Sequence, residues 1–332
     1  MPFFVALALS LLLTWAARRL GLATGLVDRP SPPDAPGSEA LKIHTAPIPV
    51  LGGLGVITAT LAALLVVGHE LPAPVLGGVI VATAVGLVDD VRPLRPSIRM
   101  LGLTAAGILM AAWLPLDRLS PLARPGLVLL VLLLANAVNL IDGQDGLAGG
   151  LAAISCAGLA AVISANGGDP VLAVVLAGSL VGFLAWNLPP ARIFLGNGGA
   201  YGLGSLLAVL AAQATLGHGW HGLLAAGLCL GVFAFELSFT VIRRLGASQG
   251  LAIGDRRHTY DLLAKSSGNR DRSTLALWTL GAVTAGSGFA ADQISLAAAI
   301  TTIAAAVVMA TAAGGRLWRA ATGPQDHSRE RG

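Results

Sequence analysis

A run of amide and carboxylate side chains, NAVNLIDGQDGLAGG, follows an apolar segment in the middle of the chain. Asn136, Asn139 and Asp142 recur every third residue, so successive members are neighbours on a helical surface. Asp145 follows on a loop flanked by glycines. Several hard oxygen atoms in a small volume suit Mg²⁺, or alternatively Mn²⁺, which binds such atoms together with substrate phosphates. A plain polar turn needs fewer polar residues, so the run predicts a metal site.

A second acidic motif, VGLVDDVRPLRPSIR, places Asp89 and Asp90 at the end of another apolar segment. Adjacent residues of a helix diverge by about 100°. The two carboxylates can therefore serve different partners, one a metal and the other a substrate. A helix that simply ends in headgroup water with its charges exposed is an equal alternative for this motif alone.

Two basic stretches could bind phosphate. GDRRHTYDLL contains Arg256, Arg257 and His258, and LKIHTAPIPVLGG contains Lys42 and His44. Arginine can hold phosphate oxygens through two hydrogen bonds at once. Cations of the first stretch are also explained by membrane topology and anionic lipid. The prolines and glycines of the second predict a broken or re-entrant helix entrance.

The stretch FLGNGGAYGLG, residues 194–204, lies between two apolar runs and contains Asn197. A hinge between membrane helices and a loop that approaches phosphate are both compatible with its glycines. We expect it to lie on the same membrane face as the acidic motifs and favour a metal and diphosphate loop. The phosphate-binding signatures of soluble proteins do not explain it, because no GxxxxGK[ST] occurs and no strand precedes the glycines.

The elements that must position these motifs are membrane helices. The chain has 332 residues, of which 55% are hydrophobic and 11% charged, with a mean hydropathy of +0.77. This composition predicts an all-α polytopic integral membrane protein with about eleven transmembrane helices, each long enough to cross roughly 30 Å of hydrocarbon. A single domain is expected over residues 1–315, followed by a short, basic, disordered cytoplasmic tail at 316–332. The apolar segments are 2–17, 47–68, 73–88, 97–114, 125–141, 147–165, 170–187, 199–216, 221–241, 274–291 and 294–313.

Positive charge indicates how the helices are oriented. With eleven crossings, 19 of the 21 Lys and Arg residues fall on one side, and only Arg118 and Arg124 on the other. The positive-inside rule makes the rich side cytoplasmic, with the N-terminus outside and the C-terminus inside. All the motifs above then share the cytoplasmic face of the inner cell membrane. No nucleic-acid partner is expected.

The motifs together resemble the polyprenyl-phosphate N-acetylhexosamine-1-phosphate transferase family. GLVDRP, KIHTAPIPVLGG, GLVDDV, NAVNLIDGQDGL, WNLPPARIFLGNGG and DRRHTYDLL occur in the family's order from about Leu26 to Leu263. The resemblance implies transfer of a HexNAc-1-phosphate, with GlcNAc favoured by the DRRH arrangement, from a UDP-sugar to a polyprenyl phosphate such as undecaprenyl phosphate, with release of UMP. This is a magnesium-dependent, initiating step of cell-wall, lipopolysaccharide or other polysaccharide synthesis.

The resemblance also implies roles for single residues. Asp89 and Asp90 would position or deprotonate the lipid phosphate, and Asp145 would contact the uracil. The full expected site is catalytic Asp89, Asp90, Asp142 and His258; substrate-binding Lys42, His44, Asp145, Arg256 and Arg257; and metal-binding Asn139, Asp90 and Asn197.

Three departures from the family pattern involve four positions. Asn197 stands where the family usually has a metal-binding aspartate, so metal affinity should fall. Tyr260 and Asp261 occupy positions that commonly hold further histidines, and Arg99 stands for a lysine. A catalytically weakened or inactive relative therefore remains an alternative. A membrane transporter is another, because polar residues at broken helices mark transport sites. The sequence does not decide between a monomer and a homodimer.

Overall fold

The computed structural model describes residues 1–30, 44, 46–114, 121–216, 218–247 and 257–293, and within these ranges the chain is mostly helical. The predicted tail at 316–332 and the eleventh predicted segment lie outside them. The helices are α1 Pro2–Thr24, α2 Gly52–Val66, α3 Ala73–Val91, α4 Pro96–Ala111, α5 Ala123–Ile141, α6 Leu147–Ala165, α7 Val171–Asn187, α8 Gly196–Thr215, α9 Gly219–Cys229, α10 Gly231–Gly246, α11 Thr259–Ser267 and α12 Arg270–Gln293.

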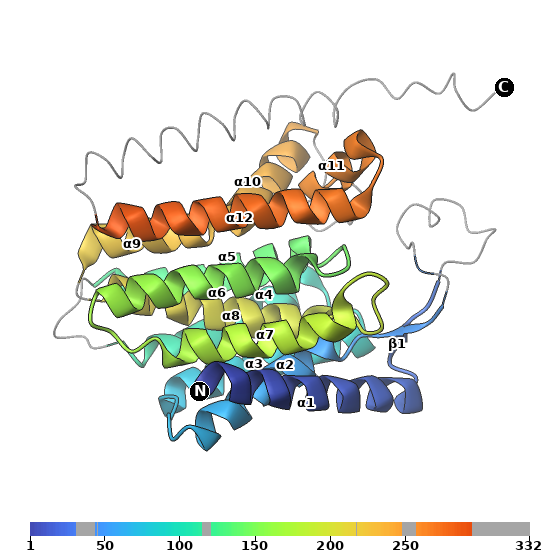
Figure 1. Cartoon of the computed structure of the whole chain (residues 1–332), viewed down its shortest axis with the longest axis horizontal. Coiled ribbons are helices and arrows are strands. Elements are labelled where there is room, and N and C mark those ends of the chain that lie inside the picture. Colours follow the sequence, from blue (N-terminus) through green and yellow to red (C-terminus); the bar gives the residue numbers. More distant parts are fainter. Residues whose placement is uncertain (31–43, 45, 115–120, 217, 248–256, 294–332) are drawn as a thin grey trace.

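Most of the helices run along one common direction and form a bundle (Figure 1). Helix α8 lies inside it and packs against α2, α3 and α5. Glycines allow this close approach: a Cβ added to Gly53 of α2 would lie 1.9 Å from the Cα of Gly199, and one added to Gly204 would lie 2.5 Å from the Cα of Ala135. Helix α1 covers the bundle beside α2 and α7, while α12 packs on α6 and α9.

Each apolar segment that was expected from the sequence and is described by the structure is helical over most of its length, which confirms the all-α class. Within the described residues, five helices are long and apolar enough to span a membrane: α1, α3, α5, α6 and α12. Helices α2, α4 and α7 are apolar but shorter, with 15, 16 and 17 residues. The count of eleven and the orientation of the termini therefore stay predictions.

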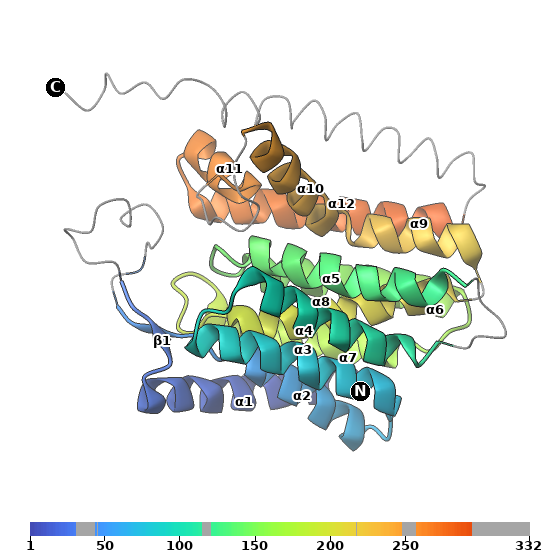
Figure 2. The same cartoon turned by 180° about the vertical axis from the view of Figure 1, so that it is seen from behind.

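The ninth predicted segment is broken. Helices α9 and α10 meet at Leu230 with a bend of 73° and would together make a sixth span. The loop that follows contains the short helix α11, which packs on α12. The bend directs α10 away from the common axis (Figure 2), and α10 packs on α5 and α12.

Two short strands join the first loop to the bundle. β1 Val27–Asp28 pairs antiparallel with β2 Ile48–Pro49. Helix α2 begins three residues later, and its first N–H groups, those of Gly52 and Gly53, donate to the carbonyls of Phe194 and Leu195. The predicted broken entrance is thus a strand followed by a helix whose N-terminus is capped by the loop between α7 and α8.

The bundle's topology collects the polar motifs at one end. Helices α3, α5, α7 and α10 end there, while α8, α11 and α12 begin there (Figure 1). The β1–β2 pair lies at the same end. Motifs that are far apart in the sequence are therefore placed around one region.

Candidate active site

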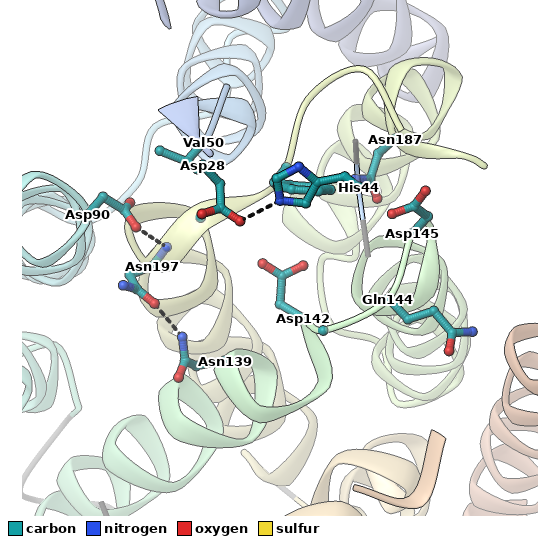
Figure 3. A pocket seen from close by; sticks show the side chains of 13 residues that line it. Asp28, His44, Val50, Asp90, Asn139, Asp142, Gln144, Asp145, Asn187 and Asn197 are labelled. Atoms are coloured by element: carbon teal, nitrogen blue, oxygen red, sulfur yellow. Dashed lines mark hydrogen bonds and ion pairs between the residues drawn. The ribbon is translucent and has the colours of Figure 1, made fainter. Parts of the chain in front are cut away.

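A polar cavity of about 250 Å³ opens at this end of the bundle (Figure 3). Four carboxylates line it against a single histidine, and no Lys or Arg of the described residues is part of its wall. The cavity is therefore strongly electronegative and suited to a cation. Its lining is Asp28, His44, Val50, Asp90, Asn139, Asp142, Gly143, Gln144, Asp145, Asn187, Phe194, Gly196 and Asn197.

Asp90 joins α3 to the first turn of α8. Its Oδ1 accepts a hydrogen bond from the N–H of Asn197 at 2.9 Å, and its Oδ2 accepts one from the N–H of Gly198 at 3.0 Å. These N–H groups lie in the first turn of the helix, where no intrahelical acceptor exists. The positive end of the helix dipole favours the carboxylate there. Asp90 thus caps α8 from a neighbouring helix.

This cap corrects the expectation of a loop at 194–204. The structure places Gly196 at the start of α8 with φ of 75°, and the glycines that follow lie inside the helix. They pack against α2, α3 and α5 and do not form a cradle for diphosphate. The physical reason is that α8 needs small residues wherever it crosses neighbouring helices closely. Asn197 nevertheless lines the cavity, as expected.

Asp142 and Asp145 follow the end of α5 on opposite sides of a tight turn. The Asp142 carboxylate points into the cavity (Figure 3). Burial raises the pKa of Asp142 well above its usual range, and the negative charge of Asp90 raises it further, whereas the N–H of Gly196 lowers it. Asp145 is anchored, because its Oδ2 accepts a hydrogen bond from the N–H of Ala191 at 2.9 Å. A cation in the cavity would stabilise the ionised form of Asp142.

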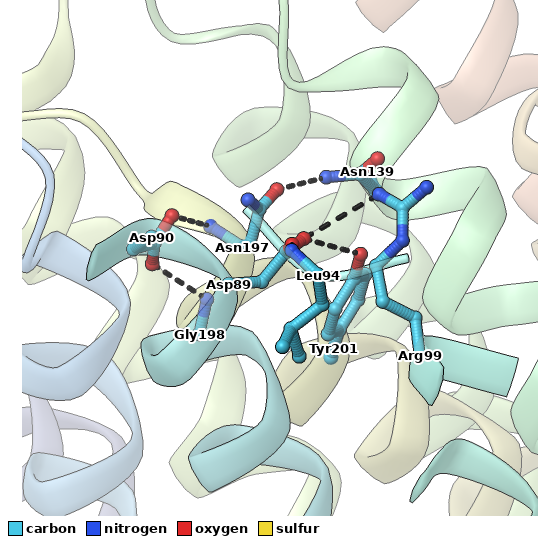
Figure 4. Close-up of polar contacts among 8 residues, drawn as sticks. All are labelled: Asp89, Asp90, Leu94, Arg99, Asn139, Asn197, Gly198 and Tyr201. Carbon is cyan, nitrogen blue, oxygen red and sulfur yellow. Dashed lines mark hydrogen bonds and ion pairs between the residues drawn. The ribbon is translucent and has the colours of Figure 1, made fainter. Parts of the chain in front are cut away.

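Asn139 and Asn197 face each other across the cavity wall. The Asn139 Nδ2 donates to the Asn197 Oδ1 at 2.5 Å (Figure 4). Both residues were expected to bind metal, and the structure brings them together with Asp90 and Asp142. This hydrogen bond uses the nitrogen of Asn139 and the oxygen of Asn197, so the amide oxygen of Asn139 stays available to bind a ligand.

Asp89 lies beside Asp90 but serves other partners. Its carboxylate accepts hydrogen bonds from the N–H of Leu94 at 2.7 Å, from Arg99 at 3.4 Å and from the Tyr201 hydroxyl at 3.3 Å (Figure 4). Asp89 is buried, with 7% of its surface exposed, and is outside the cavity lining. The expected divergence of the two carboxylates is confirmed. Arg99, at the position where the resemblance implied a lysine, is a cation paired with Asp89.

His44 lines the cavity from the first loop. Its Nε2 lies 2.9 Å from the Oδ2 of Asp28, and its Nδ1 lies 2.8 Å from the carbonyl of Ala46. Asp28 was not predicted as a site residue, although it belongs to the GLVDRP motif. A second cavity of about 430 Å³ continues past His44 and Asp145 and includes Arg18 and Arg192 in its lining. Lys42 lies outside the described residues.

The last loop approaches the cavity through Tyr260. A Cβ added to Gly143 would lie 2.0 Å from the Tyr260 hydroxyl, so the ring covers the turn between Asp142 and Asp145. His258 stacks on Tyr260, with ring centroids 5.3 Å apart. His258 itself is not among the residues that line the cavity. Arg257 is described near the same loop, whereas Arg256 lies outside the described residues.

Two further residues near this loop were missed by the sequence reasoning. Glu236 of α10 is fully buried and bonds to His258. A carboxylate in an apolar segment is itself a functional signal and could have identified it. Gln144 of the acidic turn donates to the carbonyl of Arg270 at 2.8 Å and to the hydroxyl of Thr274, which joins the turn to α12.

The side chains of the cavity offer oxygen ligands of the kind a divalent metal ion needs. Among the described residues, no three His, Cys, Asp or Glu side chains form a metal-binding group by themselves. Hard cations also accept amide oxygens, water and substrate phosphates, and Mg²⁺ commonly uses only one or two carboxylates. Asp90 and Asp142 with the amide of Asn139 meet that need. The residues present fit a magnesium ion shared with a phosphorylated substrate.

Helices apolar enough to span a membrane, with an acidic, oxygen-lined cavity at one end, define a membrane protein with a polar site. Comparison with known proteins identifies the family. The sequence model for glycosyl transferase family 4 matches residues 73–215, which contain Asp89, Asp90, Asn139, Asp142 and Asn197. The chain belongs to this family and is a sugar-phosphate transferase, which confirms the resemblance seen in the motifs.

Curated relatives agree with this assignment. The chain is 28% identical over 302 residues to a probable undecaprenyl-phosphate N-acetylglucosaminyl 1-phosphate transferase of Bacillus subtilis, covering 84% of this chain and 81% of that protein. It is 34% identical over 263 residues to a phospho-N-acetylmuramoyl-pentapeptide-transferase of Synechococcus, covering 69% and 70%. A decaprenyl-phosphate N-acetylglucosaminephosphotransferase of Mycobacterium leprae is 29% identical, over 71% of each chain.

Proposed function

We propose that this protein transfers a HexNAc-1-phosphate, with GlcNAc as the favoured sugar, from a UDP-sugar to a polyprenyl phosphate at the cytoplasmic membrane face. The observation that carries the proposal is the convergence of Asp90, Asp142 and Asn139 at the N-terminus of α8, in a chain of this family. Several relatives are named for undecaprenyl or decaprenyl phosphate and N-acetylglucosamine, which supports this acceptor and sugar.

In this reaction an oxygen of the lipid phosphate attacks the β-phosphorus of the UDP-sugar. The bond from the β-phosphorus to the bridging oxygen of UMP breaks, and UMP leaves. When ionised, Asp90 and Asp142 make the reacting end of the bundle negative, so the two anionic substrates require cations to meet there. A bound Mg²⁺ would supply charge neutralisation for the diphosphate. Asp90, Asp142 and Asn139 are the residues that would hold it.

The remaining residues bind and orient substrate. Asp145 is held by the N–H of Ala191 at the boundary of the two cavities, in position to accept a hydrogen bond from a base. Arg18 and Arg192 line the second cavity and provide positive charge for an anionic group. His44 lies between the two cavities with Nε2 on Asp28 and Nδ1 on the Ala46 carbonyl, so it can donate to a phosphate oxygen only in exchange for one of these partners.

One observation favours a different nucleotide-sugar substrate. Several relatives are phospho-N-acetylmuramoyl-pentapeptide-transferases, and one of them is 34% identical to this chain. Against that donor, the last loop reads His258-Thr-Tyr-Asp and is poorer in histidine than the corresponding loop of that branch. The muramoyl-pentapeptide nucleotide therefore belongs in any substrate panel.

The test is UMP release by purified protein with undecaprenyl phosphate, Mg²⁺ and a panel of UDP-sugars that includes UDP-GlcNAc, UDP-GalNAc and the muramoyl-pentapeptide nucleotide. The proposal expects release with a UDP-HexNAc and little with the pentapeptide nucleotide. No release with any donor at high Mg²⁺ would show an inactive relative. Uptake of labelled donor into proteoliposomes without transfer to lipid would revive the transporter.

A further inference from the structure

Glu236 is a buried carboxylate with no place in the proposed chemistry so far. It lies on α10, just after the 73° bend, and none of its surface is exposed. Its Oε1 accepts hydrogen bonds from the Nδ1 of His258 at 2.7 Å and from the Thr240 hydroxyl at 2.9 Å. Its Oε2 accepts one from the N–H of Thr259 at 3.1 Å and another from the Thr259 hydroxyl. Four donors thus converge on one carboxylate.

These contacts fix both the place and the proton of His258. The Thr259 N–H is the first of α11, so Glu236 caps that helix and holds the backbone that carries His258. A carboxylate facing Nδ1 keeps the proton on that nitrogen, as in the carboxylate–histidine pairs of hydrolases. Nε2 is then the ring atom available to a ligand, and among the described residues no partner is recorded for it.

The His258 ring is connected to the wall of the cavity through Tyr260. His258 stacks parallel to Tyr260, with an angle of 4° between the rings, and the Tyr260 hydroxyl covers Gly143 of the acidic turn. The Ser273 hydroxyl donates to the Tyr260 carbonyl at 2.8 Å, which ties this segment to α12. Glu236, His258 and Tyr260 therefore form a rigid connection from the bent helix to the turn that carries Asp142 and Asp145.

We propose that Glu236 is the positioning residue for His258: it holds the Nδ1 proton and so presents Nε2 to the phosphates of the substrate. This inference rests on the proposed transferase function and adds a residue to its site. It gives the bend between α9 and α10 a purpose, since a straight helix would carry Glu236 along the bundle axis.

The substitution Glu236→Gln gives a sharp test because it predicts a change of tautomer. The backbone N–H of Thr259 can only donate, so the amide oxygen of the glutamine must take the place of Oε2. Its NH₂ group then takes the place of Oε1 and donates to Nδ1 of His258, while the Thr240 hydroxyl turns to accept. The histidine must now carry its proton on Nε2, so the ring cannot accept a proton at that atom. The neutral glutamine also no longer supplies a negative charge to stabilise a protonated, positively charged ring.

We expect Glu236→Gln to lower the turnover of UDP-HexNAc by about 10- to 100-fold with little change in KM for the donor. In a His258→Ala background the same substitution should cause no further loss. Thr240→Val is the matched control. It removes a donor to the same carboxylate oxygen, a hydroxyl that also lies 3.4 Å from Nδ1 of His258, but it keeps the Glu236 carboxylate that holds the Nδ1 proton. Its turnover should therefore stay within about twofold of the parent protein.

The position of the proton is read independently of turnover by ¹⁵N NMR of histidine-labelled protein in nanodiscs. The chain has six histidines, and the signals of His258 are found by comparison with His258→Ala. An Nδ1 proton in the parent protein and an Nε2 proton in Glu236→Gln support the proposal. An unchanged tautomer, or an equal loss of turnover in the His258→Ala background, overturns it. Absence of transfer by the parent protein with every donor overturns the proposed function instead, and the spectra still decide the hydrogen-bond arrangement.

Discussion

The carboxylate of Asp90 caps a helix to which it does not belong, by accepting the N–H of Asn197 at 2.9 Å. The bond joins the end of α3 to the start of α8, and a second one to Gly198 strengthens it. A carboxylate oxygen can accept more than one contact, so Asp90 can cap α8 and still face a cation in the cavity. Fold and site therefore share this residue.

Replacing Asp90 by alanine should affect both stability and transfer, and an aspartate beside the start of α7, at the other end of the bundle, separates the two effects. Asp169 accepts the N–H of Val171 at 2.9 Å at the start of α7. Asp90→Ala and Asp169→Ala should each lower the free energy of unfolding by roughly 1 kcal/mol. Only Asp90→Ala should abolish UMP release. Equal loss of transfer in both variants, at equal stability, would mean that Asp90 acts through the fold alone.

Asn197→Asp should lower the Mg²⁺ concentration needed for half-maximal transfer. Asn139 donates to the Asn197 Oδ1, and a carboxylate accepts that hydrogen bond equally well, so the local structure should be preserved. The variant adds a negative charge to a wall that already holds Asp90 and Asp142, which increases the attraction for a divalent cation. Asn197→Ala is the opposing variant, and it should raise the Mg²⁺ requirement. Identical Mg²⁺ curves for all three proteins would exclude Asn197 from the metal site.

The sequence was sufficient to predict most of the described helices and several of the residues that meet at the cavity. Amide and carboxylate residues at every third position imply one helical face, and Asn139 and Asp142 do line the same cavity. The divergence of Asp89 from Asp90 follows from the 100° between adjacent helical residues. Both predictions depend on local geometry, which a sequence encodes directly.

Features that depend on distant partners could not be predicted in this way. The glycines after Asn197 suggested a phosphate loop, but their function is set by α2, α3 and α5, whose positions no local pattern reveals. Glu236 meets His258, which is 22 residues away, only because of the bend at Leu230. The length of an apolar run also does not show how much of it becomes helix. The run at 47–68 is long enough to span a membrane, but its helix α2 has only 15 residues where about 20 are needed.

Gly196→Ala should be far more destabilising than the same change at Gly25. Both glycines have φ near 73–75°, so each alanine meets a similar backbone cost of roughly 1 kcal/mol. A Cβ at Gly196 would also lie 2.1 Å from the carbonyl of Val50, whereas none of the described atoms lies within 4 Å at Gly25. The difference in melting temperature between the two variants, measured by thermal unfolding in detergent, gives the cost of the close contact with Val50, because the cost of the backbone angle is similar in both. Equal melting temperatures would show that Val50 moves away at little cost.

Arg99 should be replaceable by lysine but not by a neutral residue. Asp89 is buried, and Arg99 is the cation with which it pairs, at 3.4 Å. Removing that charge with Arg99→Met leaves a buried carboxylate without its counterion, which costs roughly 3–5 kcal/mol for a fully buried pair. Because Arg99 is partly exposed, the loss here should be smaller.

Arg99→Lys keeps the charge and should retain transfer within about threefold. Tyr201→Phe removes only the hydroxyl that donates to Asp89, so it should cost about 1 kcal/mol. Chemical denaturation and UMP release on the three variants test this order, and a stable, active Arg99→Met protein would show that Asp89 does not need a cation.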